Sequence, residues 1–275
     1  MSRTFKHDFS LHLVLGLLAI FTFYPFIFMV ITSFKTSPQF IHDFWGIAWP
    51  PTLANYRDAW SRVNGYLFNS IIVSGVSMVG VLIIASISGF VFARFNFPGR
   101  ELFFFAILAL LMIPSVLTLV PAFLLVKDLG LINTYWALIL PYIAGGQIFA
   151  IFILRSFIAG LPEELFEAAR LDGASTLQAF RSIVLPLSKP ILVTIAVMNV
   201  LGTWNDYIWP LVTIPDSKLW TISVGIVTFG STLRGLESWG PMFAGFVIAS
   251  VPMIILFVFT MRYFIAGLTS GAIKA

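Results

Sequence analysis

The chain has 275 residues, of which 59% are hydrophobic and only 10% are charged, and its mean hydropathy is +0.97. Soluble domains carry about 25% charged residues, so this composition excludes an ordinary soluble protein, and the lack of cysteine excludes disulfides, thiolate metal sites and thiol nucleophiles. The net charge of +4 comes without a basic run, so basic loops facing anionic lipid explain it better than a nucleic-acid partner does.

Six stretches are long and apolar enough to cross a bilayer, which needs about 20 mainly apolar residues per helix. The first is too long and too aromatic for a cleaved signal peptide, so we expect a retained anchor. The sequence therefore predicts an all-α membrane protein in which residues 1–275 form one transmembrane domain. The predicted spans are 11–32, 66–93, 102–126, 135–157, 191–213 and 241–261.

Prolines interrupt most of these stretches. Each proline removes a backbone donor and can kink its helix, and in lipid the freed carbonyl must find a neighbouring helix or water. Broken helices are common in transporters, although proline is also ordinary in membrane helices. The prolines concerned are Pro25, Pro114, Pro121, Pro141, Pro210 and Pro252.

The distribution of positive charge predicts the orientation. Ten lysine and arginine residues fall on the side of the two termini and six on the other side. Cytoplasmic loops are the richer in Lys and Arg, so both termini are expected in the cytoplasm, together with the loop 158–190. Tryptophans of the outer segments could anchor a protein partner or the membrane surface equally well: Trp45, Trp49, Trp60, Trp220 and Trp239.

The loop 158–190 has the pattern of two short amphipathic helices. Pro162 suits the first position of a helix that ends before Gly173, where glycine supplies a left-handed residue. Ser175 and Gln178 have the spacing of a capping box for a second helix, which Pro186 is expected to end. On physical grounds alone, the pair could equally be an interfacial element packed on the end of the bundle.

The same loop contains a spaced set of residues that matches a known motif. The residues are Glu167, Ala168, Ala169, Gly173, Ile183, Leu185 and Pro186. In this spacing they resemble the EAA loop of ABC importer permeases. The resemblance implies a coupling helix that docks in a cleft of a cytoplasmic ATPase subunit. In that case Glu167 makes the charged contact, Ala168 and Ala169 form the close-packed surface, and Gly173 makes the turn.

Further short motifs resemble the carbohydrate-uptake branch of this family, and their order resembles the second permease of maltose-type systems. The resemblance implies the type I importer fold, with a second related permease as heterodimer partner, two ATP-binding cassette subunits and an extracytoplasmic sugar-binding protein. The motifs are FNFPGR (95–100), MIPSVLTLVP (112–121), GLINT (130–134), LPY (140–142), WNDY (204–207) and GLTSGAIKA (267–275).

The resemblance also implies a multi-pass protein of a prokaryotic inner or plasma membrane, with no cofactor in this chain. ATP and magnesium would bind the partner ATPase, and the sequence indeed lacks GxxxxGK[ST]. The tail is implied to contact that ATPase, although a frayed terminus is as good an interpretation. The tail residues concerned are Thr269, Ser270, Gly271 and Lys274.

The fifth stretch contains the most polar intramembrane cluster. Asp206 is costly in hydrocarbon, so it is expected to face the bundle interior, a water-filled cavity or a partner subunit. Amide, carboxylate and aromatic groups suit a sugar, but they also tie helices together and anchor interfaces. The candidate pathway residues are Asn199, Trp204, Asn205, Asp206, Tyr207 and, in the fourth stretch, Gln147.

Two other classes of function were weighed against the importer permease. An ion-coupled secondary transporter is expected to carry paired intramembrane charges or internal repeats, yet Asp206 is the one plausible intramembrane carboxylate. An intramembrane enzyme has no constellation to support it, because neither HExxH nor GxSxG occurs. The sequence names no particular sugar.

Overall fold

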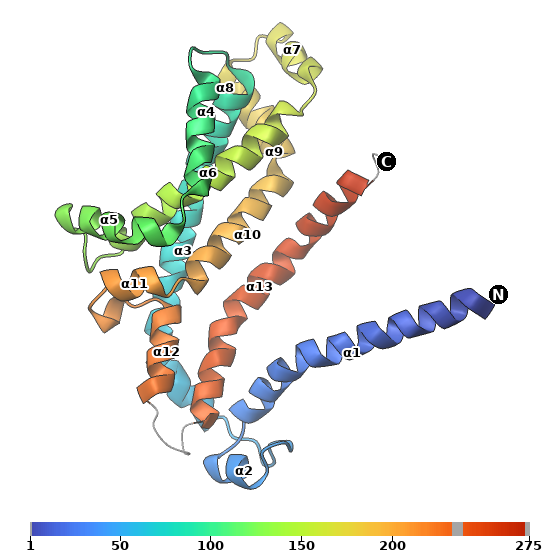
Figure 1. The fold of residues 1–275 in the computed structure, drawn as a ribbon, viewed down its shortest axis with the longest axis vertical. Coiled ribbons are helices and arrows are strands. Elements are labelled where there is room, and N and C mark those ends of the chain that lie inside the picture. The colour runs from blue at the N-terminus through green and yellow to red at the C-terminus, as the bar shows by residue number, and fades with distance from the viewer. Residues whose placement is uncertain (1, 233–238, 273–275) are drawn as a thin grey trace. The chain divides into compact units, whose positions relative to one another are not determined.

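The computed structural model describes residues 2–232 and 239–272, with side chains described for 11–230 and 239–261. Figure 1 shows the elements in chain order. Within these ranges the secondary structure is helical, without a strand. The helices are α1 (Ser2–Ser33), α2 (Ser37–His42), α3 (Ala54–Arg94), α4 (Arg100–Ala109), η1 (Leu110–Met112), α5 (Ser115–Asp128), α6 (Trp136–Ala159), α7 (Glu163–Leu171), α8 (Thr176–Ala179), η2 (Phe180–Val184), α9 (Leu185–Leu187), α10 (Lys189–Asn205), α11 (Ile208–Thr213), η3 (Ser217–Leu219), α12 (Ile222–Thr232) and α13 (Trp239–Ala272).

The membrane-spanning capacity of the described helices agrees with an all-α membrane protein. Four helices are long and apolar enough to cross a bilayer, and the number rises to six if each of two bent pairs forms one span. One bent pair joins Arg100–Met112 to Ser115–Asp128 at 104°, and the other joins Thr176–Leu187 to Lys189–Asn205 at 72°. The segment 102–126 is therefore divided at Pro114, which lies between η1 and α5.

The chain forms two compact units. The first runs to Asn64 and includes Gly225–Pro252, and the second holds Gly65–Val224 and continues from Met253. The second contains the candidate site.

In the first unit, a buried lysine organises the segment after α1. The Lys35 side chain is only 1% exposed, and its Nζ donates to the carbonyls of Asp43 and Phe44 at 2.6 and 2.9 Å. The Asn55 amide donates to the carbonyls of Ser33 and Lys35, both at 2.8 Å. These bonds join the start of α3 to the end of α1, while Trp49 projects outward with 82% of its surface exposed.

In the second unit, two apolar clusters hold the helices together. One joins α3, α6 and α10 through buried residues such as Val81, Leu154 and Ile195. The other lies around Leu138 of α6 and Trp209 of α11. Because lipid tails are as apolar as these side chains, close packing rather than exclusion of water stabilises such contacts in a membrane.

The second amphipathic helix of the loop continues further than predicted. Instead of ending at Pro186, it passes through a π-helical turn, Phe180–Val184, into α9 and ends at Leu187. The Leu185 N–H bonds to the Phe180 carbonyl, five residues back. A π turn widens the helix just before the proline, which relieves the clash that a proline ring makes with the preceding turn.

Candidate functional site: a helical docking element and a membrane cavity

The turn after α7 is closed by a complete Schellman motif. Gly173 has φ +76°, its N–H bonds to the Arg170 carbonyl at 3.0 Å, and the Ala174 N–H bonds to the Ala169 carbonyl at 2.9 Å. These two bonds satisfy carbonyls that a helix end leaves free. The left-handed glycine predicted from the sequence is thus confirmed as the stop of α7.

The helix α7 has one packed and one exposed side. Phe166 is buried in the core that joins α3, α6 and α10. Glu167 and Ala168 are exposed, Ala169 is half-buried, and Leu171 is 89% exposed. The packed side is therefore that of Phe166, whereas the neighbouring Leu165 is exposed.

The segment that follows α7 begins with the predicted capping box. The Ser175 hydroxyl accepts a hydrogen bond from the Gln178 N–H at 3.3 Å, and the Gln178 side chain accepts one from the Ser175 N–H at 2.7 Å. The three remaining positions of the loop motif lie further along. Ile183 and Leu185 are half-buried, whereas Pro186 is exposed. Ile183 packs against the same core as Phe166.

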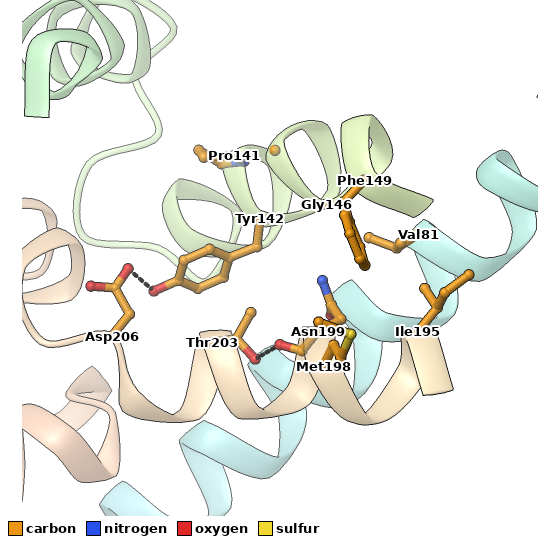
Figure 2. Close-up of a pocket in the computed structure, with 12 residues that line it drawn as sticks. Val81, Pro141, Tyr142, Gly146, Phe149, Ile195, Met198, Asn199, Thr203 and Asp206 are labelled. Carbon is orange, nitrogen blue, oxygen red and sulfur yellow. Dashed lines mark hydrogen bonds between the residues drawn. The ribbon is translucent and has the colours of Figure 1, made fainter. Parts of the chain in front are cut away.

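A cavity of about 430 Å³ lies between α3, α6 and α10. Figure 2 shows Tyr142, Gly146 and Phe149 on one wall, from α6, and Asn199, Thr203 and Asp206 on the facing wall. Two of the six candidate pathway residues, Asn199 in α10 and Asp206 just after it, are thus brought to one cavity. The full lining is Val81, Pro141, Tyr142, Gly145, Gly146, Phe149, Ile195, Met198, Asn199, Gly202, Thr203 and Asp206.

Asp206 lies where the helix breaks between α10 and α11. Its Oδ2 accepts a hydrogen bond from the Tyr142 hydroxyl at 2.9 Å, and its Oδ1 accepts one from the Trp209 N–H at 3.3 Å. The second bond caps the start of α11 as an N-terminal side-chain oxygen does. A second cavity, of about 330 Å³, shares Pro141, Tyr142 and Asp206 with the first. The carboxylate therefore stands in the wall common to both cavities.

Two amide groups near the cavity have acceptor atoms without a partner. The Asn199 Oδ1 is buried and accepts no hydrogen bond from any described residue, and the same holds for the Gln147 Oε1. The Gln147 Nε2 donates to the Val81 carbonyl at 3.4 Å, and Gln147 does not line the cavity. A buried acceptor left free costs stability, and the Asn199 Oδ1 is closed to the cavity although other atoms of the Asn199 side chain line it.

The other predicted pathway residues lie outside the cavity lining. Trp204 is buried, and its carbonyl accepts a hydrogen bond from the Ser223 hydroxyl. Asn205 is exposed and donates back to the Leu201 carbonyl at 2.8 Å, while Tyr207 is half-buried. Tyr142, Phe149 and Thr203 line the cavity but were not in our set. Tyr142 stands in the LPY motif, a signal that could have marked it.

The remaining predictions concern metal and the tail. The described residues contain no group of three or more metal-ligating side chains. Thr269, Ser270 and Gly271 belong to the last part of the α13 backbone, and their side chains lie outside the described residues. Lys274 lies entirely outside the described residues.

Together, the apolar helices and the cavity between α3, α6 and α10 define a multi-pass membrane protein. The sequence model of the family "Binding-protein-dependent transport system inner membrane component" matches residues 81–270. The chain belongs to this family. It is a permease subunit and not an enzyme, which confirms the family and the fold class that the sequence predicts.

Curated relatives match nearly the whole chain. The arabinooligosaccharides transport system permease protein AraQ of Halalkalibacterium halodurans is 36% identical, over 94% of this chain and 93% of its own. The trehalose/maltose transport system permease protein MalG of Thermococcus litoralis is 34% identical, over 95% of this chain and 96% of its own. The sn-glycerol-3-phosphate transport system permease protein UgpE of Brucella suis is also 34% identical, over 94% of each chain.

Solved structures share the fold. A chain of a bacterial ABC transporter involved in the import of the acidic polysaccharide alginate superposes with a TM-score of 0.84 at 22% identity, covering 96% of this chain and 99% of its own. A chain from the alginate transporter in complex with an alginate pentasaccharide-bound periplasmic protein gives a TM-score of 0.63 at 17% identity, with 94% of each chain covered. At these identities the likeness concerns the fold alone.

Proposed function

We propose that this chain is one of two related permease subunits in an ATP-driven importer for a sugar, an oligosaccharide in particular, and that it forms half of the translocation pathway. The observation that carries the proposal is α7: its buried Phe166 and its Schellman turn at Gly173 hold Glu167 and Ala168 on an exposed face. A partner ATPase docks on this face, and ATP and magnesium bind that partner.

The orientation follows from the same assignment. The excess of Lys and Arg on the side of the termini places α7 and both termini in the cytoplasm of a prokaryotic cell. Extracytoplasmic segments then meet a sugar-binding protein, with exposed aromatic residues such as Trp45 and Trp49 available for contact. The tail from Thr269 to Lys274 reaches the ATPase.

The chemistry of the cavity supports a sugar as cargo. The Asp206 carboxylate offers acceptor oxygens to hydroxyl groups, the Asn199 amide lines the same cavity, and Phe149 offers an aromatic face. The lining residues include the Asp206 carboxylate but no lysine or arginine. A wall with this charge favours an uncharged sugar over an anionic one. Relatives named for arabinooligosaccharides and for trehalose and maltose support the same class of cargo.

The first test is to purify the chain in mild detergent from its own host and to identify co-purifying proteins by mass spectrometry. We expect two nucleotide-binding ATPase subunits for each pair of related permeases. Purification of the chain alone, or as a homodimer without an ATPase, would instead favour an ion-coupled secondary transporter. The binding protein is then screened for sugars by thermal shift, which identifies the cargo.

A further inference from the structure

Arg94, the last residue of α3, contacts the segments on both sides of the turn into α7. Its Nη2 donates to the carbonyls of Ile158 and Leu161 at 2.9 and 2.6 Å. Its Nη1 donates to Oε2 of Glu163, the first residue of α7, at 2.5 Å. The guanidinium also lies over the Phe166 ring, 4.0 Å from its centroid. One side chain thus joins the end of α3, the end of α6 and the start of α7.

The contacts of Arg94 depend on the planar guanidinium group, which lysine lacks. A planar guanidinium presents several donors in a fixed fork and stacks on an aromatic ring, whereas an ammonium is a single point charge. The carbonyls of Ile158 and Leu161 belong to the last turn of α6 and the residues after it, where intrahelical bonds end; the Ile158 carbonyl also accepts the Leu161 N–H at 3.2 Å. The Arg94 side chain is only 13% exposed, so water competes little for these bonds.

The helix α7 is too short to hold its position alone. It has nine residues, and isolated helices below about 12 residues are marginal in water. Its place relative to α3 and α6 therefore depends on tertiary contacts. The buried Phe166 ring and the Glu163 carboxylate are two such contacts, and Arg94 touches both of them.

We propose that Arg94 is a positioning residue for energy coupling. It clamps α7 to the end of α3, so that a movement of α3 and a movement of α7 are transmitted to each other. This inference rests on the proposed docking of an ATPase on α7. Arg94 itself need not touch the ATPase, because it acts through Glu163 and Phe166.

A second arginine provides a matched control. Arg155 donates to both carboxylate oxygens of Glu101, at 2.6 and 2.8 Å, and its guanidinium lies 3.7 Å from the centroid of the Phe104 ring. Its side chain is 20% exposed. Arg155 thus has the same chemistry and similar burial, but it joins α6 to α4 and not to α7.

The position of α7 can be measured directly. The chain contains no cysteine, so a pair of spin labels at Leu171→Cys and Ile87→Cys reports the distance between α7 and α3. Both sites are exposed. Arg94→Gln is expected to broaden the distribution of label distances in the full chain. Arg94→Lys is expected to give a distribution between those of Arg94→Gln and the parent. Arg155→Gln is expected to leave the distribution of the parent unchanged.

The second readout is the number of sugar molecules transported per ATP in the reconstituted transporter, without labels. We expect a several-fold fall in this ratio for Arg94→Gln, partial recovery for Arg94→Lys, and an unchanged ratio for Arg155→Gln. A loss of stability alone would lower the amount of active transporter and leave the ratio unchanged. Thermal unfolding of both glutamine variants checks that they fold.

Either of two results overturns the proposal: an unchanged distance distribution in Arg94→Gln, or a broadened distribution with an unchanged transport ratio. A failure of the proposed function would be recognised separately. The label distances test the clamp between α3 and α7 and need no ATPase. The proposed docking role of α7 is tested by co-purification, and it fails if the chain co-purifies with no ATPase.

Discussion

The Tyr142 hydroxyl donates a hydrogen bond of 2.9 Å to the Asp206 carboxylate, joining two residues that are 64 positions apart in the chain. The bond ties α6 to the break between α10 and α11 (Figure 2). Both residues line the two cavities of the second unit. A carboxylate that accepts a hydroxyl from the protein can also accept one from a sugar, so we propose that a sugar hydroxyl can replace the Tyr142 hydroxyl at Asp206.

Removing either partner of this bond is predicted to alter transport. Tyr142→Phe deletes the donor, and a hydrogen bond to a charged group contributes about 1.5–3 kcal/mol. Asp206→Asn keeps an acceptor oxygen but removes the charge. We expect both variants to assemble with their partners and to show altered uptake kinetics in proteoliposomes that contain the complete transporter. Unchanged kinetics in Asp206→Asn would remove this residue from the pathway.

The control for Tyr142→Phe is Tyr135→Phe. Tyr135 also donates a side-chain hydrogen bond within the second unit, to Oδ1 of Asn69 at 2.7 Å. It lines neither of the two cavities. The control is therefore expected to lose a similar bond without the change in uptake kinetics. If both variants alter uptake equally, the effect comes from loosened helix packing.

Substitutions at the neighbouring glycines Gly145 and Gly146 of α6 distinguish an effect on the shape of the cavity from a general effect on helix packing. A Cβ added at Gly146 would lie 2.7 Å from Val81 Cγ2 and 2.8 Å from Asn199 Nδ2, whereas one added at Gly145 meets nothing within 4 Å. Gly146→Ala is thus predicted to displace the Asn199 amide and to lower uptake. Gly145→Ala is predicted to leave the fold intact, because its methyl group has room.

Uptake and thermal unfolding of the two alanine variants should be measured side by side. Overpacking of a well-packed site costs about 1–3 kcal/mol, so Gly146→Ala is expected to unfold at a lower temperature as well. Equal behaviour of both variants in both assays would show that the approach of α6 to Val81 and Asn199 is not as tight as described.

Local signals in the sequence predicted the loop well. The stop at Gly173 and the capping box of Ser175 and Gln178 are set by residues within a few positions of one another, so spacing was enough to identify them. The angle by which a proline bends the chain cannot be predicted from such local spacing. Pro114 marks a possible break, but the 104° bend between the flanking helices depends on what each packs against.

Contacts between distant segments were out of reach of the sequence pattern. Nothing near Arg94 indicates that it pairs with Glu163, 69 positions away, and Phe166 looks no different from the exposed Leu165 beside it. Lys35 was counted as an ordinary outer-segment charge, yet it is buried because two carbonyls happen to converge on it. Such facts follow from tertiary structure, which a single sequence does not reveal.

The buried Lys35 leads to a prediction about the first unit. Lys35→Met fills a similar volume but removes both hydrogen bonds to the carbonyls of Asp43 and Phe44, and a hydrogen bond from a charged group contributes about 1.5–3 kcal/mol. The segment 36–53 should then open. Limited chymotrypsin digestion with mass spectrometry is expected to show faster cleavage after Phe44 and Trp45. The exposed Lys218 provides the control, since Lys218→Met should digest as the parent does.

The turn at Gly173 gives the sharpest prediction for the proposed function. Gly173 holds φ +76°, and the space around its missing Cβ is open, so a substitution there strains the backbone without a steric clash. A left-handed residue with a side chain costs about 1–2 kcal/mol, and a branched side chain tolerates this region least. Gly173→Val is expected to disturb the end of α7 and to impair ATPase docking and ATP-driven uptake, with the membrane helices still inserted.

The variant Gly173→Asn tests whether the effect of Gly173→Val comes from backbone strain or from the mere presence of a side chain at this position. Asparagine tolerates the left-handed region better than other residues with a side chain, so this variant should retain most of the sugar-stimulated ATP hydrolysis that Gly173→Val loses. The same ranking is expected for co-purification of the ATPase. Because the Schellman bonds position the exposed Glu167 and Ala168, normal sugar-stimulated hydrolysis in Gly173→Val would mean that α7 is not the coupling element.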